Sequence, residues 1–250
     1  MEIKKKYALI TGASSGIGRS LAVNLSAKYN LILHGRNEER LQETRALCRK
    51  EHEQLIFKHD LEKIEEIENA ISTIVNDHNL EIVHFVHCAG FLKMLPFKMV
   101  TVDLIQATMA TNFISAALIA KVLVQKKIND SALESIVFVS SNISNCGAKA
   151  FSVYAASKGA LDSLMRCLAV ELAPKVRVNS VLPGAIQTEM TKNMFENAEV
   201  IDRMVRTYPL GFGRVEDISP MVEFLLSEGA RWITGQQFTI DGGRNINITG

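Results

Sequence analysis

Short apolar runs alternate with helical segments along almost the whole chain. The runs are rich in Val, Ile, Leu and Phe, and they fall at 7–10, 31–33, 55–57, 82–86, 136–139, 176–182 and 238–240. Helical candidates lie between them, at 17–27, 38–50, 64–76, 102–127, 154–172 and 215–226. Because parallel strands need a crossover connection, usually a helix, this order predicts an α/β fold with a parallel sheet and helices on both faces. No repeat or linker divides the chain, so we expect one doubly wound domain over residues 1–250 with seven strands.

The composition excludes several classes of partner. With 47% hydrophobic and 22% charged residues, the chain is typical of a soluble globular protein. Its net charge of +1 gives no electrostatic reason to expect nucleic acid or a membrane surface as a partner. The most apolar stretch, 104–124, contains Gln106, Asn112 and Ser115, which favours a buried helix over a membrane span. No secretory cleavage pattern follows residues 1–10, so we expect a cytoplasmic protein.

The cysteines and histidines form no metal-binding pattern. The four cysteines are scattered, without a CxxC pair, and the six histidines contain no HExxH motif. We therefore expect no metal and four reduced thiols that mostly fill space in the core: Cys48, Cys88, Cys146 and Cys167.

A glycine-rich stretch, TGASSGIG at 11–18, follows the first apolar run and opens the first helical segment. In this context Gly12, Gly16 and Gly18 allow a tight turn and a close approach of the backbone to a pyrophosphate, while the helix N-terminus offers amide donors. The spacing GxxxGxG alone is a weak signal, because other tight strand-to-helix turns also use glycines. We predict a dinucleotide site that includes Ser14, Ser15 and Ile17.

The second strand ends in His-Gly-Arg-Asn at 34–37, without an acidic residue. An acid at this position of a dinucleotide fold binds the ribose 2′-hydroxyl of NAD. The guanidinium of Arg36 instead suits a 2′-phosphate, so we predict that NADP(H) is preferred over NAD(H). Ser14 and Ser15 are candidate donors to the same phosphate, and an Arg36 that merely points to water is the alternative.

Tyr154 and Lys158 are spaced for proton transfer. Four residues apart on a helix, they share one face. A nearby ammonium favours phenolate and lowers the pKa of a tyrosine, which otherwise is about 10. An amphipathic helix with an incidental Tyr and Lys is the alternative interpretation of these two residues.

The segment 187–212 interrupts the alternation of strands and helices and contains several Met, Phe and Tyr residues. It is interpreted as a lid over a partly apolar substrate, or as a helix pair packed on the body.

Taken together, these motifs resemble the short-chain dehydrogenase/reductase family. The likeness runs nearly end to end, most closely to the 3-oxoacyl-acyl-carrier-protein reductase group, and rests on ordered markers: TGASSGIG at 11–18, Asp60-Leu61, Asn112, Ser141, YAASK at 154–158, PGAIQT at 183–188, ITG at 233–235 and DGG at 241–243. The resemblance implies a Rossmann-like domain with sheet order 3-2-1-4-5-6-7. It also implies a homotetramer that assembles through the helices at 102–127 and 154–172 and the C-terminal strand.

By this resemblance, the catalytic residues are Asn112, Ser141, Tyr154 and Lys158. Tyr154 is the general acid, Ser141 polarises the substrate carbonyl, and Lys158 lowers the pKa of Tyr154 and binds the nicotinamide ribose. Asn112 holds a water that links Lys158 to solvent. Ser140 is a competing candidate for the serine role, and without the resemblance Asn112 would be interpreted as a helix residue satisfied by backbone.

The resemblance also implies further cofactor contacts. Tyr154 and Lys158 belong to this set, together with residues that follow the third, fourth and sixth strands: Asp60, Leu61, Ala89, Gly90, Pro183, Gly184, Ile186 and Thr188. The chain departs from the family at His87-Cys88, where Asn-Asn is common and helps tie the sheet together. We interpret this as tolerated variation, since imidazole can donate and accept hydrogen bonds although Cys is a weak partner.

The expected activity is NADPH-dependent reduction of a carbonyl to a secondary alcohol. The preferred substrate is a 3-oxoacyl thioester, free or carried by an acyl-carrier protein, as in fatty acid biosynthesis. The alternatives are a sugar, steroid or other secondary alcohol dehydrogenase of the same family, or a non-catalytic sensor that binds NADP.

Overall fold

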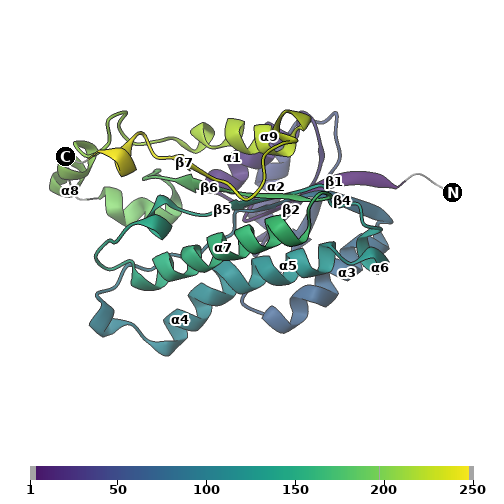
Figure 1. Ribbon diagram of the computed structural model, residues 1–250, viewed down its shortest axis with the longest axis horizontal. Helices are drawn as coiled ribbons and strands as arrows, with labels where there is room; N and C mark the ends of the chain where they lie inside the picture. The colour runs from purple at the N-terminus through teal and green to yellow at the C-terminus, as the bar shows by residue number, and fades with distance from the viewer. Residues whose placement is uncertain (1–3, 197, 248–250) are drawn as a thin grey trace.

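The computed structural model describes residues 4–196 and 198–247, and within them a seven-stranded sheet forms the centre of the molecule (Figure 1). All neighbouring strands pair in parallel, in the order β3-β2-β1-β4-β5-β6-β7. The strands are β1 Lys5–Thr11, β2 Asn30–Gly35, β3 Gln54–Lys58, β4 Leu80–His87, β5 Ser135–Val139, β6 Arg177–Pro183 and β7 Gln237–Ile240. The predicted fold class and strand order are confirmed.

Helices cover both faces of this sheet. One face carries α1 (Gly16–Leu25), α2 (Glu38–Leu47) and α9 (Ser219–Leu226); the other carries α3 (Ile67–Asp77), α4 (Val102–Met109), α5 (Ser115–Leu123) and α7 (Ser152–Glu171), with the short α6 (Lys126–Asn129) beside α3 and α5 (Figure 1). The 3₁₀ turns are η1 Ile64–Glu66, η2 Phe97–Met99, η4 Asn142–Asn145, η5 Glu189–Phe195, η6 Val215–Asp217, η7 Glu228–Ala230 and η8 Arg244–Ile246, and η3 (Ala110–Ile114) is a π-helical turn.

The continuous apolar character of the strands follows from burial on both faces. In β1, Tyr7 and Leu9 belong to the cluster under α3, α5 and α7, whereas Ala8 and Ile10 belong to the cluster under α1, α2 and α9. Successive side chains of a strand point to opposite faces, so each face of this strand requires apolar residues. The hydrophobic core thus consists of two layers, one on each face of the sheet.

The direction of winding reverses between β1 and β4. The chain leaves β1 toward β2 and β3 on one side, and later β4 leads to β5, β6 and β7 on the other. Such a switch point opens a crevice at the carboxyl ends of the two strands. The glycine-rich stretch follows β1 there, and the segment 88–90 follows β4.

Helices α4 and α5 form one continuous helical stretch, Val102–Leu123, through the π turn η3. By length and composition it could span a membrane, with a mean hydropathy of 1.4. Its second half packs in the core, where Ala116, Ile119 and Leu123 are fully buried.

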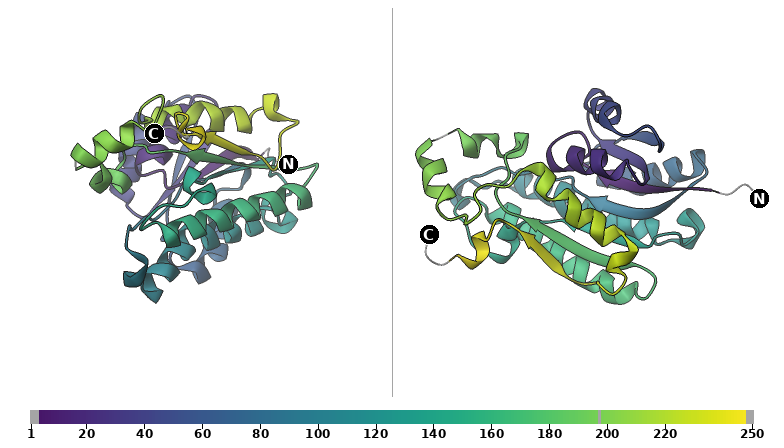
Figure 2. Two further views of the ribbon diagram at one scale, coloured as in Figure 1. Left: turned by 60° about the vertical axis from the view of Figure 1, so that its left-hand side comes forward. Right: turned by 90° about the horizontal axis from the view of Figure 1, so that it is seen from above.

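The segment 187–212 leaves and rejoins the body at one point, where Ile186 and Gly213 form a parallel β-bridge. It contains η5 and α8 (Ala198–Val205), which lie beyond the carboxyl ends of the central strands (Figures 1 and 2). Rings inside the segment pack together, with Phe212 at 5.1 Å from Phe195 and 5.3 Å from Tyr208 between centroids. The segment thus forms two short helical elements over this edge of the sheet, and its role as a lid stays a prediction.

Candidate active site

A cavity of about 550 Å³ opens at the carboxyl ends of the strands, at the switch point where ligands bind in such sheets. It is lined by every predicted site residue except Asn112: Gly12, Ser14, Ser15, Gly16, Ile17, Gly18, Arg36, Asp60, Leu61, Ala89, Gly90, Ser141, Tyr154, Lys158, Pro183, Gly184, Ile186 and Thr188. Residues that are far apart in the sequence thus share one cavity, because all of them follow strands whose carboxyl ends meet at one edge.

The glycine-rich turn packs directly on the segment that follows β4. A Cβ on Gly12 would lie 2.8 Å from the Cα of Ala89, and a Cβ on Gly18 would lie 2.1 Å from the carbonyl oxygen of Gly12. Gly12 and Gly16 also have positive φ angles, of 71° and 53°. Helix α1 begins at Gly16, so its free amides face the cavity. This cradle fits a dinucleotide pyrophosphate.

The unusual His87-Cys88 step is accommodated through Thr11 at the end of the neighbouring strand β1. The Thr11 hydroxyl accepts hydrogen bonds from the backbone N–H groups of Cys88 (3.1 Å) and Ala89 (3.2 Å). Its own hydrogen is then free to be donated to Nδ1 of His87, which lies 3.0 Å away. Burial lowers the pKa of His87 well below its usual value, so the ring is neutral. The two strands remain tied without the family's asparagines.

Arg36 lies at the rim of the cavity where β2 ends. Its Nη1 is 3.3 Å from Oε1 of Glu62, and its side chain is 65% exposed. Asp60 lines the same end and accepts a hydrogen bond from the backbone N–H of Glu62 at 3.1 Å. The Ser14 side chain lies close to Gly35, since a Cβ there would be 3.3 Å from its Oγ. These residues supply a cation and a hydroxyl at the end of the cavity that the sequence assigns to the adenosine ribose.

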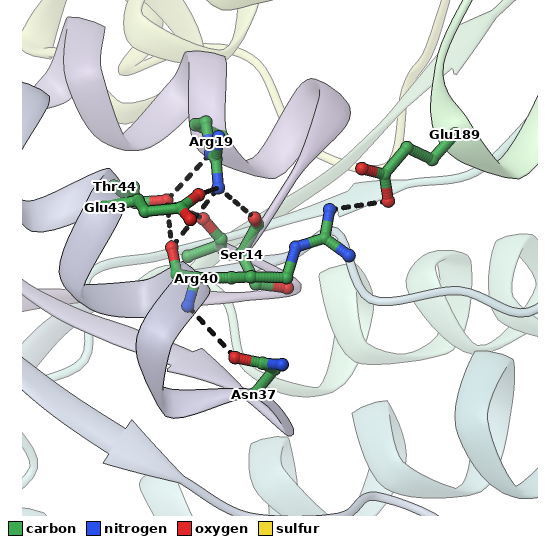
Figure 3. Close-up of polar contacts among 8 residues, drawn as sticks. Ser14, Arg19, Asn37, Arg40, Glu43, Thr44 and Glu189 are labelled. Carbon is green, nitrogen blue, oxygen red and sulfur yellow. Dashed lines mark hydrogen bonds and ion pairs between the residues drawn. The ribbon is translucent and has the colours of Figure 1, made fainter.

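A second arginine, Arg40 of α2, lines the cavity and was not identified from the sequence. Its guanidinium forms an ion pair at 2.5 Å with Glu189, the first residue of η5 (Figure 3). Neither residue stands out in the sequence, because both are charged side chains of the protein surface. Only the fold brings them together across the cavity.

Tyr154 and Ser141 form the other end of the cavity. Burial raises the pKa of Tyr154 to about 12, and a hydrogen bond with Ser141 opposes that shift. Ser140 also lines the cavity, but its hydroxyl is already engaged, since it donates a buried hydrogen bond to Oδ2 of Asp162 at 2.9 Å. The geometry therefore favours Ser141 over Ser140 as the serine that meets a substrate.

Lys158 is buried one helical turn after Tyr154. Its Nζ donates a hydrogen bond to the carbonyl of Val139 at 2.9 Å and lies 5.8 Å from the centre of the Tyr154 ring. Burial lowers the pKa of Lys158 to about 8. Burial is the largest cause of the Tyr154 pKa shift in the free protein and makes that shift upward, so the lowering of this pKa by Lys158 stays a prediction.

Asn112 lies beside the cavity rather than on its surface. It is fully buried within the π turn η3, and its amide bonds to the backbone of Phe91 in both directions, at 2.7 and 3.0 Å. Its Nδ2 also donates to Ser157 Oγ at 2.9 Å. The alternative interpretation, a helix residue satisfied by backbone, describes these contacts. Asn112 still borders the site, since a Cβ on Gly90 would be 3.7 Å from both Asn112 Oδ1 and Lys158 Nζ.

The apolar lining residues Phe91 and Leu92 had no sequence signal, whereas Met190 lies in the segment 187–212 that is interpreted as a lid. Phe91 and Leu92 follow β4, and Met190 belongs to η5. They give the cavity an apolar side, on which Met190 approaches Gly90 close to Lys158. An isolated Phe or Leu in a loop is common in any chain.

The cysteines are only partly as expected. All four are free, yet Cys146 and Cys167 are exposed, Cys88 is half-buried at the cavity and only Cys48 is buried. Among the described residues, no cluster of His, Cys, Asp or Glu is arranged to hold a metal ion.

The parallel sheet, the glycine cradle and the Ser-Tyr-Lys group at one cavity define a dinucleotide-binding oxidoreductase. Comparison with known proteins agrees. The family model described as enoyl-(acyl carrier protein) reductase matches residues 12–245. Carbonyl reductase family member 4 of Danio rerio is 32% identical over 96% of this chain and 98% of its own length. L-xylulose reductase of Caenorhabditis elegans is 31% identical over 97% of this chain and 96% of its own length.

Solved structures give the same result. A short chain dehydrogenase from Burkholderia cenocepacia, in complex with NADP, has a TM-score of 0.84 and 26% identity, with 97% of this chain and 98% of the other covered. The chain belongs to the short-chain dehydrogenase/reductase family. It is an oxidoreductase that acts on CH–OH and C=O groups.

Proposed function

We propose that this protein reduces a ketone to a secondary alcohol with NADPH. The observation that carries the proposal is the single cavity in which Ser141, Tyr154 and Lys158 lie at one end and the glycine cradle with Arg36 at the other. A dinucleotide held by the glycine cradle would have Arg36 toward its adenosine and Tyr154 toward its nicotinamide. Bound NADPH supplies the hydride.

The side chains supply the proton and the electrostatic stabilisation. Tyr154, which burial keeps protonated, donates its phenolic proton to the carbonyl oxygen as negative charge develops there. Ser141 donates a hydrogen bond to the same oxygen. The positive charge of Lys158 then stabilises the phenolate that Tyr154 leaves behind, and its hydrogen bond to Val139 fixes it in place. Asn112, hydrogen-bonded to Phe91, holds the wall behind Lys158.

The preference for NADPH rests on Arg36 and on the lack of an acid at the end of β2. A structural relative carries NADP in its solved complex, which is consistent with this preference. The test is the NADPH and NADH dependence of turnover, with Arg36→Met beside the wild type. Loss of discrimination in Arg36→Met supports the proposal, and preference of the wild type for NADH contradicts it.

For the substrate, two classes have support. Apolar side chains at the substrate end, Phe91, Leu92 and Met190, favour the acyl chain of a 3-oxoacyl thioester. The name of the relative L-xylulose reductase favours a short ketose. We propose the thioester as the first candidate, because the lining near Tyr154 offers apolar contact that a polyol does not use.

A substrate panel distinguishes the two. It consists of a short 3-oxoacyl thioester, a four-carbon and a five-carbon ketose, a ketosteroid and a simple ketone, each assayed by NADPH oxidation. Higher kcat/KM for the thioester supports the first candidate, and higher kcat/KM for a ketose supports the second. If NADPH binds tightly but no compound is turned over, both substrate proposals fail.

We also propose that the protein is a homotetramer, as the family resemblance implies. Apolar side chains are exposed on the expected surfaces: Val102 and Ile105 on α4, Val170 on α7 and Trp232 before β7. These side chains lie on the elements that the family resemblance assigns to the subunit contacts, where assembly would bury them. Sedimentation equilibrium at micromolar concentration tests this, and a stable monomer contradicts it.

A further inference from the structure

Two arginines line the cavity at its adenosine end, and each is paired with a carboxylate. Arg36, at the end of β2, contacts Glu62 at 3.3 Å. Arg40, in the first turn of α2, contacts Glu189 at 2.5 Å. Glu189 belongs to the segment 187–212, so the second pair joins the cofactor wall to the lid (Figure 3).

The main chain of Arg40 is held firmly. Its N–H donates to the N-cap side chain of Asn37 at 3.0 Å. Its carbonyl accepts from Arg19 Nη2 at 3.3 Å and from Thr44 Oγ1 at 3.0 Å. Arg19 also donates to the carbonyl of Ser14 at 2.7 Å, so one side chain ties α2 to the glycine-rich turn (Figure 3). The base of the Arg40 side chain therefore has a fixed position relative to Ser14.

The guanidinium of Arg40, in contrast, has one exchangeable partner. Within the described part of the chain its ion pair is with Glu189 alone, and the two side chains are 34% and 66% exposed. Arg40 lowers the pKa of Glu189, so the carboxylate is ionised at neutral pH. An exposed ion pair of this kind is weak and is readily replaced by a better anion.

We propose that Arg40 is a cofactor-specificity residue: it is a second cationic ligand of the 2′-phosphate, and Glu189 is the counter-ion that the phosphate displaces. This rests on the proposed use of NADPH. A phosphate dianion offers the planar guanidinium two charge-assisted hydrogen bonds, where Glu189 offers one through an exposed carboxylate. NADH has no 2′-phosphate and leaves the Arg40–Glu189 pair intact, so Arg40 acts on one cofactor and not on the other.

Substitutions of Arg40 and of Glu189 should change NADPH affinity in opposite directions. Arg40→Met removes a phosphate ligand and should weaken NADPH binding about tenfold, with less than about a twofold change for NADH. Glu189→Gln removes the competitor and should tighten NADPH binding about threefold, again with little change for NADH. Titration calorimetry with NADPH, NADH and 2′,5′-ADP measures these constants. The matched control is Arg45→Met, which removes an exposed arginine from α2 outside the cavity and should leave all three unchanged.

The double variant tests whether Glu189 acts through Arg40. In an Arg40→Met background, Glu189→Gln should no longer change NADPH affinity. If Glu189→Gln instead alters NADPH and NADH equally, the pair only holds the lid and the proposal is wrong. It is also wrong if Arg40→Met leaves the NADPH/NADH ratio unchanged while Arg36→Met collapses it. If the wild type itself prefers NADH and Arg36→Met changes nothing, the proposed cofactor is at fault.

Discussion

The ammonium of Lys158 lies 5.8 Å from the centre of the Tyr154 ring, while its hydrogen bond goes to the carbonyl of Val139 at 2.9 Å. Val139 is the last residue of β5, two positions before Ser141. The end of β5 therefore supplies the carbonyl that holds Lys158 and leads to the serine that hydrogen-bonds to Tyr154. Burial leaves the phenol protonated in the free protein, as a proton donor requires.

Replacing Tyr154 by Phe should remove the proton donor and little else. Turnover should fall at least about a hundredfold, since positioned acids contribute 10²–10⁴-fold. NADPH affinity should change less than about threefold, because the ring and Lys158 remain. Steady-state kinetics and calorimetry measure the two effects. Tyr29→Phe is the control, since Tyr29 packs on His84 away from the cavity; wild-type turnover in Tyr154→Phe would exclude it as the acid.

Replacing Lys158 by Met should stabilise the protein at neutral pH. Burial lowers the pKa of Lys158 from 10.5 to about 8, so keeping it charged costs about 3 kcal/mol below pH 8. Leaving the Val139 carbonyl without its donor costs about 1–3 kcal/mol in the variant. The free energy of unfolding should therefore rise on the order of 1 kcal/mol at pH 7 in the variant.

The stability difference between Lys158→Met and the wild type should depend on pH. The wild type loses its penalty as the pH rises from 8 to 10.5, because the lysine is then neutral in the folded state and becomes neutral in the unfolded state. The advantage of Lys158→Met should thus shrink across this range. Urea denaturation at pH 7, 8.5 and 10 measures this difference in the free energy of unfolding. An advantage of the variant that grows with pH contradicts a lowered pKa of Lys158.

Gly18→Ala should damage both the fold and the cofactor site. Its Cβ would lie 2.1 Å from the carbonyl oxygen of Gly12, a backbone atom that cannot rotate away. We expect a loss of about 3 kcal/mol in stability and weaker binding of NADPH. Gly147→Ala is the control, because nothing lies within 4 Å of a Cβ there and the change should be under about 0.5 kcal/mol. Equal thermal stability of the two variants would contradict the packing argument.

Cys88 should be a slow nucleophile despite its place at the cavity. Burial raises the pKa of its thiol to about 12, so little thiolate exists at pH 8. Iodoacetamide should label the exposed Cys146 at least about tenfold faster. Peptide mass spectrometry over time measures both rates, and preferential labelling of Cys88 would reveal an activating partner.

The sequence predicted the fold well because its signals are local and repeated. Apolar runs at strand spacing, glycines at a strand-to-helix turn and an i, i+4 Tyr-Lys pair depend on neighbours along the chain. They predicted the parallel sheet and the glycine cradle, while the strand order and the lining residues after the third, fourth and sixth strands came from the family resemblance. Asn112 is the instructive exception, since its buried hydrogen bonds to Phe91 and Ser157 depend on how a π turn meets another helix.

By itself, then, the sequence determined the class of fold, the dinucleotide cradle and the residues at the catalytic end. Only the tertiary structure decided which serine faces the tyrosine, where the Lys158 ammonium points and that Arg40 meets Glu189. The physical reason is the distance over which each effect acts. Periodicity and turn chemistry act between neighbouring residues, whereas desolvation and ion pairing depend on what the folded chain brings within a few ångströms.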